Sequence, residues 1–174
     1  DVLTVLENLF IKTFKTGINY SLVKPFIRLT FEEAMNRFGT DRPDLRFDLE
    51  LSDFTELAKS SNFTVFKNAI NDGAVIKALR LPQLAIYSRK QIEELEEHAK
   101  LFGAKGLAWM KYTEDGLTGG ISRFFEDQEQ NIRSTLSMRP GDLLLFVAAP
   151  WRTACTALGA VRTEIAKQEK RYLN

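Results

Sequence analysis

A ten-residue segment, FGTDRPDLRF, concentrates side chains that could do chemistry. Asp41 and Asp44 can accept hydrogen bonds, while Arg42 and Arg46 can bind carboxylate or phosphate groups. Pro43 is incompatible with the interior of a helix, so these donors and acceptors should stand on a stiff loop. Two interpretations of the loop stay open. It is either a binding surface or a connection in which salt bridges lock two neighbouring elements together.

The chain holds one histidine and one cysteine, and neither has the neighbours that catalysis needs. His98 lies on an expected helix, without a second histidine or a positioned serine to complete a triad. Cys155 is surrounded by small apolar residues and is expected to be a buried packing residue. The acidic run from Glu93 to Glu97 is typical of a solvated helix face. We therefore assign no catalytic and no metal-binding residue, and expect no internal disulfide.

Two further patterns resemble parts of nucleotide-binding sites. A diglycine at 119–120 followed by Arg123 could cradle a phosphate, but its spacing fits neither the P-loop nor the dinucleotide-binding fingerprint. Trp109 and Tyr112, close to Lys105, could form a stacking platform for a base. Strand alternation, however, places Trp109 and Tyr112 on opposite faces, which weakens this interpretation.

Composition limits the class of protein. Lys and Arg number 24 against 23 Asp and Glu, so no bulk field attracts DNA or an anionic membrane, and any RNA contact must be local. The apolar runs fall far short of the roughly 20 residues that span a bilayer. Because the chain begins with Asp1 inside a helical pattern and without a signal peptide, we expect a piece of a longer cytoplasmic protein.

Helical spacing dominates the first 60 residues. Apolar residues recur at helical intervals from Val2 to Phe14, and Gly17 is expected to end that helix. A second helix, FEEAMNRF, should start after a capping box and end at Gly39. The segment TDRPDLRFDLEL, residues 40–51, follows as a loop, called the charged loop below. After it, Ser52 or Asp53 can cap a short third helix.

The best-organised stretch is SRKQIEELEEHAKLFGAKGLAWMKY, residues 88–112. Ser88 and Gln91 form a capping box, and Gly103 provides the left-handed residue that ends a helix. The inner face of this helix is expected to hold Ile92, Leu95, Ala99 and Phe102. An apolar strand should follow over residues 107–112.

The remaining elements complete an α+β domain. Asn71-Asp72-Gly73 between apolar runs predicts a hairpin of two strands, around Phe63–Val65 and Val75–Leu81. A polar helix over 126–136 should precede a central strand, Leu143–Ala149, that is covered on both faces. Pro150 can open a last helix whose inner face would carry five apolar residues: Ala154, Ala157, Leu158, Val161 and Ile165. The predicted order is β-β-α-β-α-β between flanking helices.

Several motifs also resemble a known family. PFIRLTFEEAMNRFGTDRPDLRFDLEL is similar to the segment that precedes the large insertion of bacterial-type aspartyl-tRNA synthetases. SRKQIEELEEHAKLFGAKGLAWMKY, PGDLLLFVAA and ALGAVRTEIAK resemble, in the right order, that insertion and its exit. The insertion is the GAD domain, which also occurs in the B-type subunit of tRNA-dependent amidotransferases.

This resemblance implies a fragment of a class II, homodimeric enzyme that uses ATP and Mg²⁺ to activate L-aspartate and then esterifies tRNA(Asp). Residues 1–50 would belong to its catalytic domain, 51–150 to the GAD-type insertion and 151–174 to a helix that returns to the catalytic domain. The family's catalytic and ATP-binding motifs fall outside this chain, so we expect the fragment alone to be inactive and to hold no cofactor.

The resemblance leaves two alternatives for the insertion, besides the disfavoured amidotransferase subunit. It could contact the tRNA acceptor arm through residues of the charged loop, Lys105 or Arg123, or it could be a structural appendage, which the balanced charge favours. The chain also departs from the family pattern. The family commonly has Ser-Asp-Lys-Pro where Thr40-Asp41-Arg42-Pro43 stands here, and Pro-Gly-Gly where Pro82-Gln83-Leu84 stands, which puts glycine-dependent contacts there in doubt.

Overall fold

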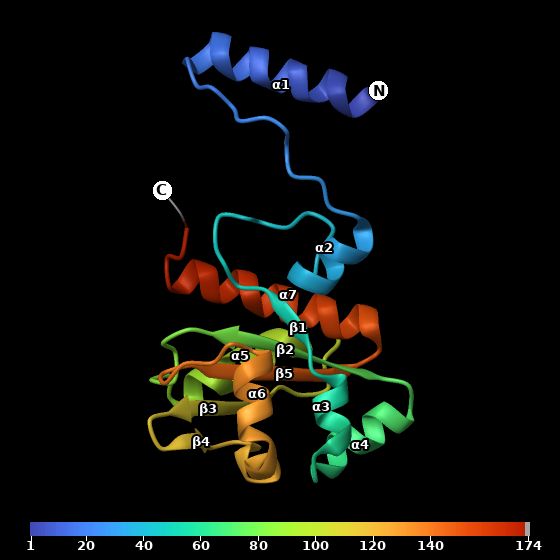
Figure 1. Cartoon of the computed structure of the whole chain (residues 1–174), viewed down its shortest axis with the longest axis vertical. Coiled ribbons are helices and arrows are strands. Elements are labelled where there is room, and N and C mark those ends of the chain that lie inside the picture. The colour runs from blue at the N-terminus through green and yellow to red at the C-terminus, as the bar shows by residue number, and fades with distance from the viewer. Residues whose placement is uncertain (173–174) are drawn as a thin grey trace. The chain divides into compact units, whose positions relative to one another are not determined.

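The computed structural model describes residues 1–172, which divide into two compact units at Thr30 and Phe31 (Figure 1). The first unit contains α1, Val2–Ile18, and an extended segment. The Asp1 carboxylate caps α1 by accepting hydrogen bonds from the backbone N–H groups of Leu3 and Thr4. The helix continues through Gly17, which was expected to end it, because Asn19 takes the left-handed conformation instead, at φ 53°.

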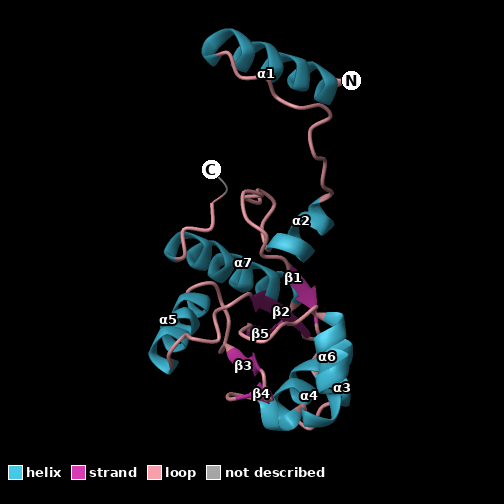
Figure 2. Ribbon diagram, turned by 60° about the vertical axis from the view of Figure 1, so that its left-hand side comes forward, coloured by secondary structure: helices cyan, strands magenta, loops and turns pink. Residues whose placement is uncertain are grey.

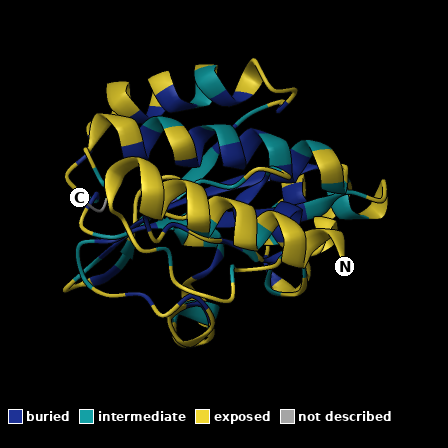
Figure 3. Ribbon diagram, turned by 90° about the horizontal axis from the view of Figure 1, so that it is seen from above, coloured by how far each residue is buried: buried dark blue, intermediate teal, exposed yellow. Residues whose placement is uncertain are grey.

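No residue of α1 is buried, and Figure 3 colours most of its ribbon as exposed. Its apolar side chains are therefore accessible within this unit. Across the described residues, no helix combines the length and the hydropathy needed to cross a membrane.

The second unit is built on a five-stranded sheet with the strand order β1-β2-β5-β3-β4 (Figure 2). Every adjacent pair of strands is antiparallel. The strands are β1 Leu51–Asp53, β2 Val75–Leu81, β3 Ala108–Thr113, β4 Gly116–Thr118 and β5 Leu143–Ala149. The expectation that Leu143–Ala149 is a central, covered strand is confirmed, since β5 lies between β2 and β3 and nearly all of it is buried.

Helices cover both faces of this sheet. They are α2 Phe31–Phe38, α3 Thr55–Ser60, α4 Thr64–Asn71, α5 Arg89–Lys100, α6 Glu129–Thr135 and α7 Trp151–Gln168, with the 3₁₀ turns η1 Ser122–Phe124 and η2 Glu126–Gln128. Residues of α5 and α7 pack in one apolar cluster against one face, and residues of α3, α4 and α6 pack in a second cluster against the other. The α+β class is confirmed.

The predicted hairpin at Asn71-Asp72-Gly73 is wrong. Residues 64–71 form the helix α4, which buries Phe66 against the sheet, so only the second arm of the expected hairpin, β2, is a strand. Gly73, at φ 83°, sits just past the end of α4 and turns the chain into β2. An Asp-Gly pair serves as a helix end as well as a hairpin turn, and the spacing of Phe63, Phe66 and Ile70 favoured the helix.

The stretch from 88 to 112 matches its prediction with one exception. The capping box of Ser88 and Gln91 is present, and Ile92, Leu95 and Ala99 are buried. Phe102, expected in the core, is 42% exposed because α5 ends at Lys100 and the chain turns before that side chain can face inward. The short strand β4 was not predicted, since its three residues carry no usable pattern.

Helix α7 packs on the sheet with its inner side and receives α2 on its outer side. The five predicted inner residues are all fully buried. At the crossing with α2, Gly39 and Gly159 bring the two backbones together, since a Cβ built on Gly159 would lie 2.8 Å from the carbonyl oxygen of Phe38. Gly39 also needs its left-handed φ of 74°. Only glycine permits this approach.

We expect Gly159→Ala to lower the free energy of unfolding by about 2 kcal/mol, because the added methyl group overlaps α2 backbone that cannot withdraw. This loss should outweigh the gain in helix propensity of about 1 kcal/mol. Urea unfolding of the chain measures the change. The matched control is Gly17→Ala in α1, where nothing lies within 4 Å of the new Cβ, and there no loss is expected. Equal effects of the two substitutions would contradict the crossing geometry.

Candidate functional site

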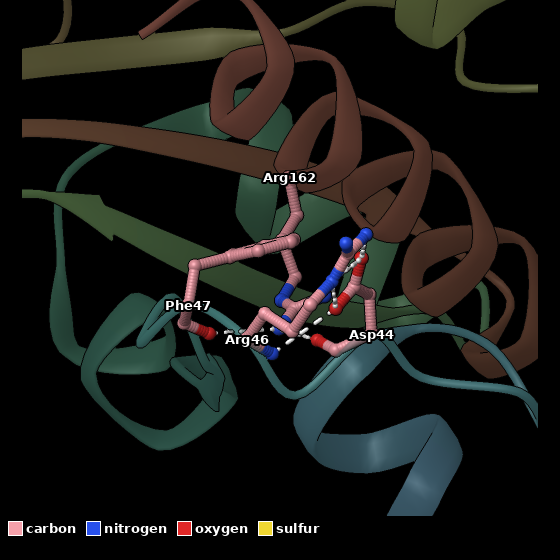
Figure 4. A network of polar contacts seen from close by, with 4 residues as sticks. All are labelled: Asp44, Arg46, Phe47 and Arg162. Atoms are coloured by element: carbon pink, nitrogen blue, oxygen red, sulfur yellow. Dashed lines mark hydrogen bonds and ion pairs between the residues drawn. The ribbon is translucent and has the colours of Figure 1, made fainter. Parts of the chain in front are cut away.

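The charged loop between α2 and β1 carries four of the six candidate residues, and Arg162 of α7 holds it in place (Figure 4). Arg162 is fully buried. Its guanidinium donates to the carbonyl oxygens of Asp44, at 2.8 Å, of Phe47, at 3.2 Å, and of Leu49. One side chain therefore satisfies three carbonyls of a segment that makes no ladder hydrogen bonds.

Aromatic rings complete the surroundings of this guanidinium. The Arg162 Cζ lies 4.1 Å from the ring centroid of Phe47 and 4.9 Å from that of Phe38. Such stacking suits a weakly hydrated, planar cation. Burial lowers the pKa of Arg162 to about 10, so the group stays charged at neutral pH.

Arg46 and Asp44 form the ion pair of the loop's outer side. The Arg46 Nη2 lies 2.6 Å from Asp44 Oδ2, and its guanidinium also lies over the ring of Tyr172, at 4.7 Å from the centroid. The hydrogen bonds from Arg46 lower the pKa of Asp44 from 3.8 to about 2. Asp44 thus points its carboxylate toward Arg46 while its backbone carbonyl binds Arg162.

A second ion pair closes the loop. Arg37 of α2 donates two hydrogen bonds to Glu50, at 2.8 and 2.6 Å, and this bidentate contact lowers the pKa of Glu50. The loop is thus fixed along its whole length. The contact of Gly39 with α7 holds its start, the hydrogen bonds from Arg162 hold its middle, and the ion pair with Arg37 holds its end. This is the geometry of a locked connection, one of the two interpretations left open by the sequence.

The other two candidate members of the loop face solvent. The Arg42 side chain is 92% exposed and that of Asp41 is 64% exposed, with 3.9 Å between Arg42 Nε and the Asp41 carboxylate. A contact this long between exposed groups holds neither side chain firmly. Both remain accessible to a partner, and a role in binding tRNA stays a prediction.

Lys105 and Arg123 come from other parts of the unit, and the structure does not bring them together with the charged loop. Arg123 is exposed on η1 and stacks on Phe124, at 4.7 Å from the ring centroid. Lys105 lies on the wall of a cavity of about 790 Å³ near the end of β5. The sequence did not predict this cavity.

The departure at Pro82-Gln83-Leu84 leaves the shape of that turn intact. Gln83 adopts a left-handed φ of 61°, the conformation that glycine would take most easily. Its side-chain amide donates to the carbonyl of Pro140, and its backbone N–H donates to the carboxylate of Asp142. The turn therefore keeps a glycine-like backbone, held by hydrogen bonds of the glutamine.

Sequence reasoning missed Arg162 as a functional part of the loop. Its position was available, because residue 162 lies four after Leu158 and three before Ile165, at the edge of the predicted inner face of the last helix. A charge at the edge of a buried helix face signals a buried partner. The partners themselves were not predictable, because they are backbone carbonyls more than 110 residues away.

The groups of this site are arranged to position the loop through hydrogen bonds and ion pairs. His98 packs against the ring of Phe102, and Cys155 is buried, which raises the pKa of its thiol. No group of three His, Cys, Asp or Glu side chains among the described residues could hold a metal ion.

Comparison with known proteins places these features in context. The family model described as GAD domain matches residues 66–158. An aspartate–tRNA(Asp/Asn) ligase of Treponema denticola is 49% identical over 170 residues, which cover 96% of this chain and 29% of that ligase. A protein of the same name from Moorella thermoacetica is 42% identical, over 99% of this chain and 29% of its own length. The chain thus spans less than a third of these relatives.

We expect Arg162→Met to lower the free energy of unfolding by about 3 kcal/mol. The reason is that the three loop carbonyls bonded to Arg162 lose a charged hydrogen-bond donor. Urea unfolding measures the loss, and limited proteolysis should show faster cleavage within residues 40–48. Arg152→Met, an exposed position on the same helix, serves as the control and should change neither quantity. An intact, protease-resistant loop in the Arg162 variant would contradict the anchoring role.

The lowered pKa of Asp44 makes some of the stability depend on pH. Because the folded pKa, about 2, lies below the ordinary 3.8, the contribution is complete above pH 3.8 and is lost as the pH falls toward 2. We expect Asp44→Asn to remove this component, which amounts to at most about 1 kcal/mol for a pair open to solvent. The free energy of unfolding, measured between pH 5 and 2, should change less with pH for Asp44→Asn than for Asp41→Asn. An identical dependence on pH in the two variants would refute the assignment.

Proposed function

This chain belongs to the GAD domain family, and from that membership we propose that it is a non-catalytic segment of an aspartate–tRNA ligase. One observation carries the proposal. The similarity to the ligases extends over 96–99% of the chain, well beyond the residues that match the GAD domain. A chain that shared only the GAD domain with these enzymes would match from about residue 66 onward. The match over nearly the whole of this chain therefore favours the ligase over the amidotransferase subunit.

The proposed parent attaches L-aspartate to tRNA(Asp) in two steps. The aspartate carboxylate attacks the α-phosphate of ATP to give aspartyl-adenylate and pyrophosphate, and a tRNA hydroxyl then attacks the aspartyl carbonyl, which forms the ester and releases AMP. Among the described residues, no group of three His, Cys, Asp or Glu side chains could hold a metal ion. We propose that ATP and Mg²⁺ bind to regions of the parent outside this chain, where the family's ATP-binding motifs are expected to lie, and that the parent is a cytoplasmic homodimer.

Unit 1 is proposed to pack on the rest of the catalytic domain. The exposed side chains of α1 include the large apolar residues Val2, Val5, Leu9 and Phe10, which are 47–75% exposed. An apolar helix face of this length normally meets a partner surface. In the proposed division, residues 1–50 belong to the catalytic domain, 51–150 to the insertion and 151–174 to the returning helix.

The insertion is proposed to be an accessory scaffold. In the loop that leads into the insertion, Arg46, Asp44 and Glu50 are engaged in internal ion pairs, and the net charge of the whole chain is +1. The rival role, contact with the tRNA acceptor arm, would rest on the exposed Arg42, Lys105 and Arg123. It predicts RNA binding that weakens steeply with salt, since each neutralised phosphate releases counterions.

The proposal is tested with the full-length protein that contains this chain and, beside it, the 174-residue chain alone. We expect the full-length protein to show aspartate-dependent exchange of pyrophosphate into ATP and to charge tRNA(Asp), and the chain alone to do neither. A titration of the chain with the same tRNA at low and high salt separates the scaffold from the RNA-binding role.

Two results would overturn the proposal. A folded full-length protein that activates another amino acid, or none, would exclude an aspartate–tRNA ligase. Aspartate-dependent exchange by the 174-residue chain would show that the segment carries a catalytic centre.

A further inference from the structure

Strand β5 is longer than its neighbour β3, and this leaves the end of an inner strand without a partner on one side. β2 pairs with all of β5, from Leu143 to Ala149. β3 begins only at Ala108, opposite Phe146, so the last three residues of β5 have β2 on one side and no strand of the described residues on the other. The cavity of about 790 Å³ lies at this notch, with Ala148 in its wall.

The backbone of Ala148 faces the notch. Its partner in β2 is Ile76, whose C=O accepts from Phe54 N–H at 2.8 Å and whose N–H donates to Thr55 Oγ1 at 3.0 Å. Both groups of Ile76 thus point toward β1. Directly opposed antiparallel residues exchange two hydrogen bonds or none, so Ala148 makes none with Ile76. Its N–H and C=O point to the side that β3 leaves vacant, and no described residue bonds to either.

Aromatic and small residues surround this free donor and acceptor. Phe63, Phe66, Trp109 and Phe146 line the cavity, together with the glycine at 106. The volume lies within the range of about 300–1,000 Å³ that small-molecule sites occupy. An apolar slot with one backbone donor beside one backbone acceptor suits a flat heterocycle with the complementary edge.

The charged side chains around the cavity indicate which further group the ligand carries. Lys105 is exposed on the cavity wall, and no hydrogen bond or ion pair engages its ammonium group in the described chain. Two acidic residues also line the cavity, Glu96 and Asp72, and Glu96 is already paired with Lys100 at 3.0 Å. A ligand with a phosphate on the Lys105 side satisfies the free cation.

We infer that this cavity binds a nucleotide, with its base hydrogen-bonded to the N–H and C=O of Ala148 and its phosphate near Lys105. Adenine carries a ring-nitrogen acceptor beside an exocyclic amino donor, which matches the two groups of Ala148. Aromatic side chains can stack on any base, because every base has a π-face.

An added peptide strand fits the notch less well. Successive hydrogen-bonding positions on one side of a strand are two residues apart, and the position after Ala148 on this side is Pro150, which has no N–H. A peptide would gain the pair at Ala148 and little more. A heterocycle needs only that pair.

The test is a titration of the ¹⁵N-alanine-labelled 174-residue chain with adenosine 5′-monophosphate, up to concentrations on the order of 10 mM. We expect the Ala148 amide resonance to shift in a saturable way. N6,N6-dimethyladenosine 5′-monophosphate lacks the donor and ribose 5-phosphate lacks the base, and both should bind at least about tenfold more weakly. A free nucleotide and the trinucleotide ApApA, compared in separate titrations, show whether the site prefers a mononucleotide or single-stranded RNA.

Two variants keep the inference falsifiable. Lys105→Ala should weaken binding of the monophosphate about fivefold and leave binding of adenosine unchanged, whereas Lys67→Ala, an exposed lysine on α4 outside the cavity lining, should change neither. A monophosphate that leaves the Ala148 amide unshifted, or that binds no better than ribose 5-phosphate, overturns the inference. It rests on the cavity alone, so its failure would leave the ligase proposal intact.

Discussion

The second unit depends on how the buried guanidinium of Arg162 is compensated. An arginine taken out of water without partners costs several kcal/mol, and here three backbone carbonyls and two aromatic faces replace the lost hydration. The benefit is mutual, because the described ladder hydrogen bonds begin only at Leu51, after the loop that supplies the carbonyls. One side chain therefore fixes the course of the chain between α2 and β1, and with it the entry into the sheet.

The exposed charges of the loop are secondary to this anchor. Arg46 contacts both Asp44 and Tyr172. It can make both contacts only because the loop backbone beneath it is fixed. The same order holds at the other end, where the Arg37 pair with Glu50 joins two exposed residues. Surface ion pairs of this kind add little stability by themselves. They refine a conformation that the buried arginine determines.

Local signals made much of the fold predictable from the sequence. The capping box at Ser88, the continuous apolar run of β5 and the inner face of α7 each depend on residues within one or two turns of each other, and the structure confirms them. The prediction failed where one signal has two meanings, as for Asp72-Gly73. It also failed for contacts across the chain, since neither the partners of Arg162 nor the notch beside Ala148 follows from spacing. A strand that starts three residues late is a matter of register, which a single sequence does not encode locally.

The close contact of Gly39 with Gly159 has a consequence for how such a unit can be carried by a larger protein. The chain enters the sheet region just after Gly39 and leaves it along α7, which contains Gly159. The points of entry and exit are therefore in contact. A host that accepts the intervening residues needs only to separate a pair of adjacent backbone positions, and the entropic cost of closing a loop grows slowly with its length. More than a hundred residues can then be gained or lost at one point of the host with little disturbance on either side.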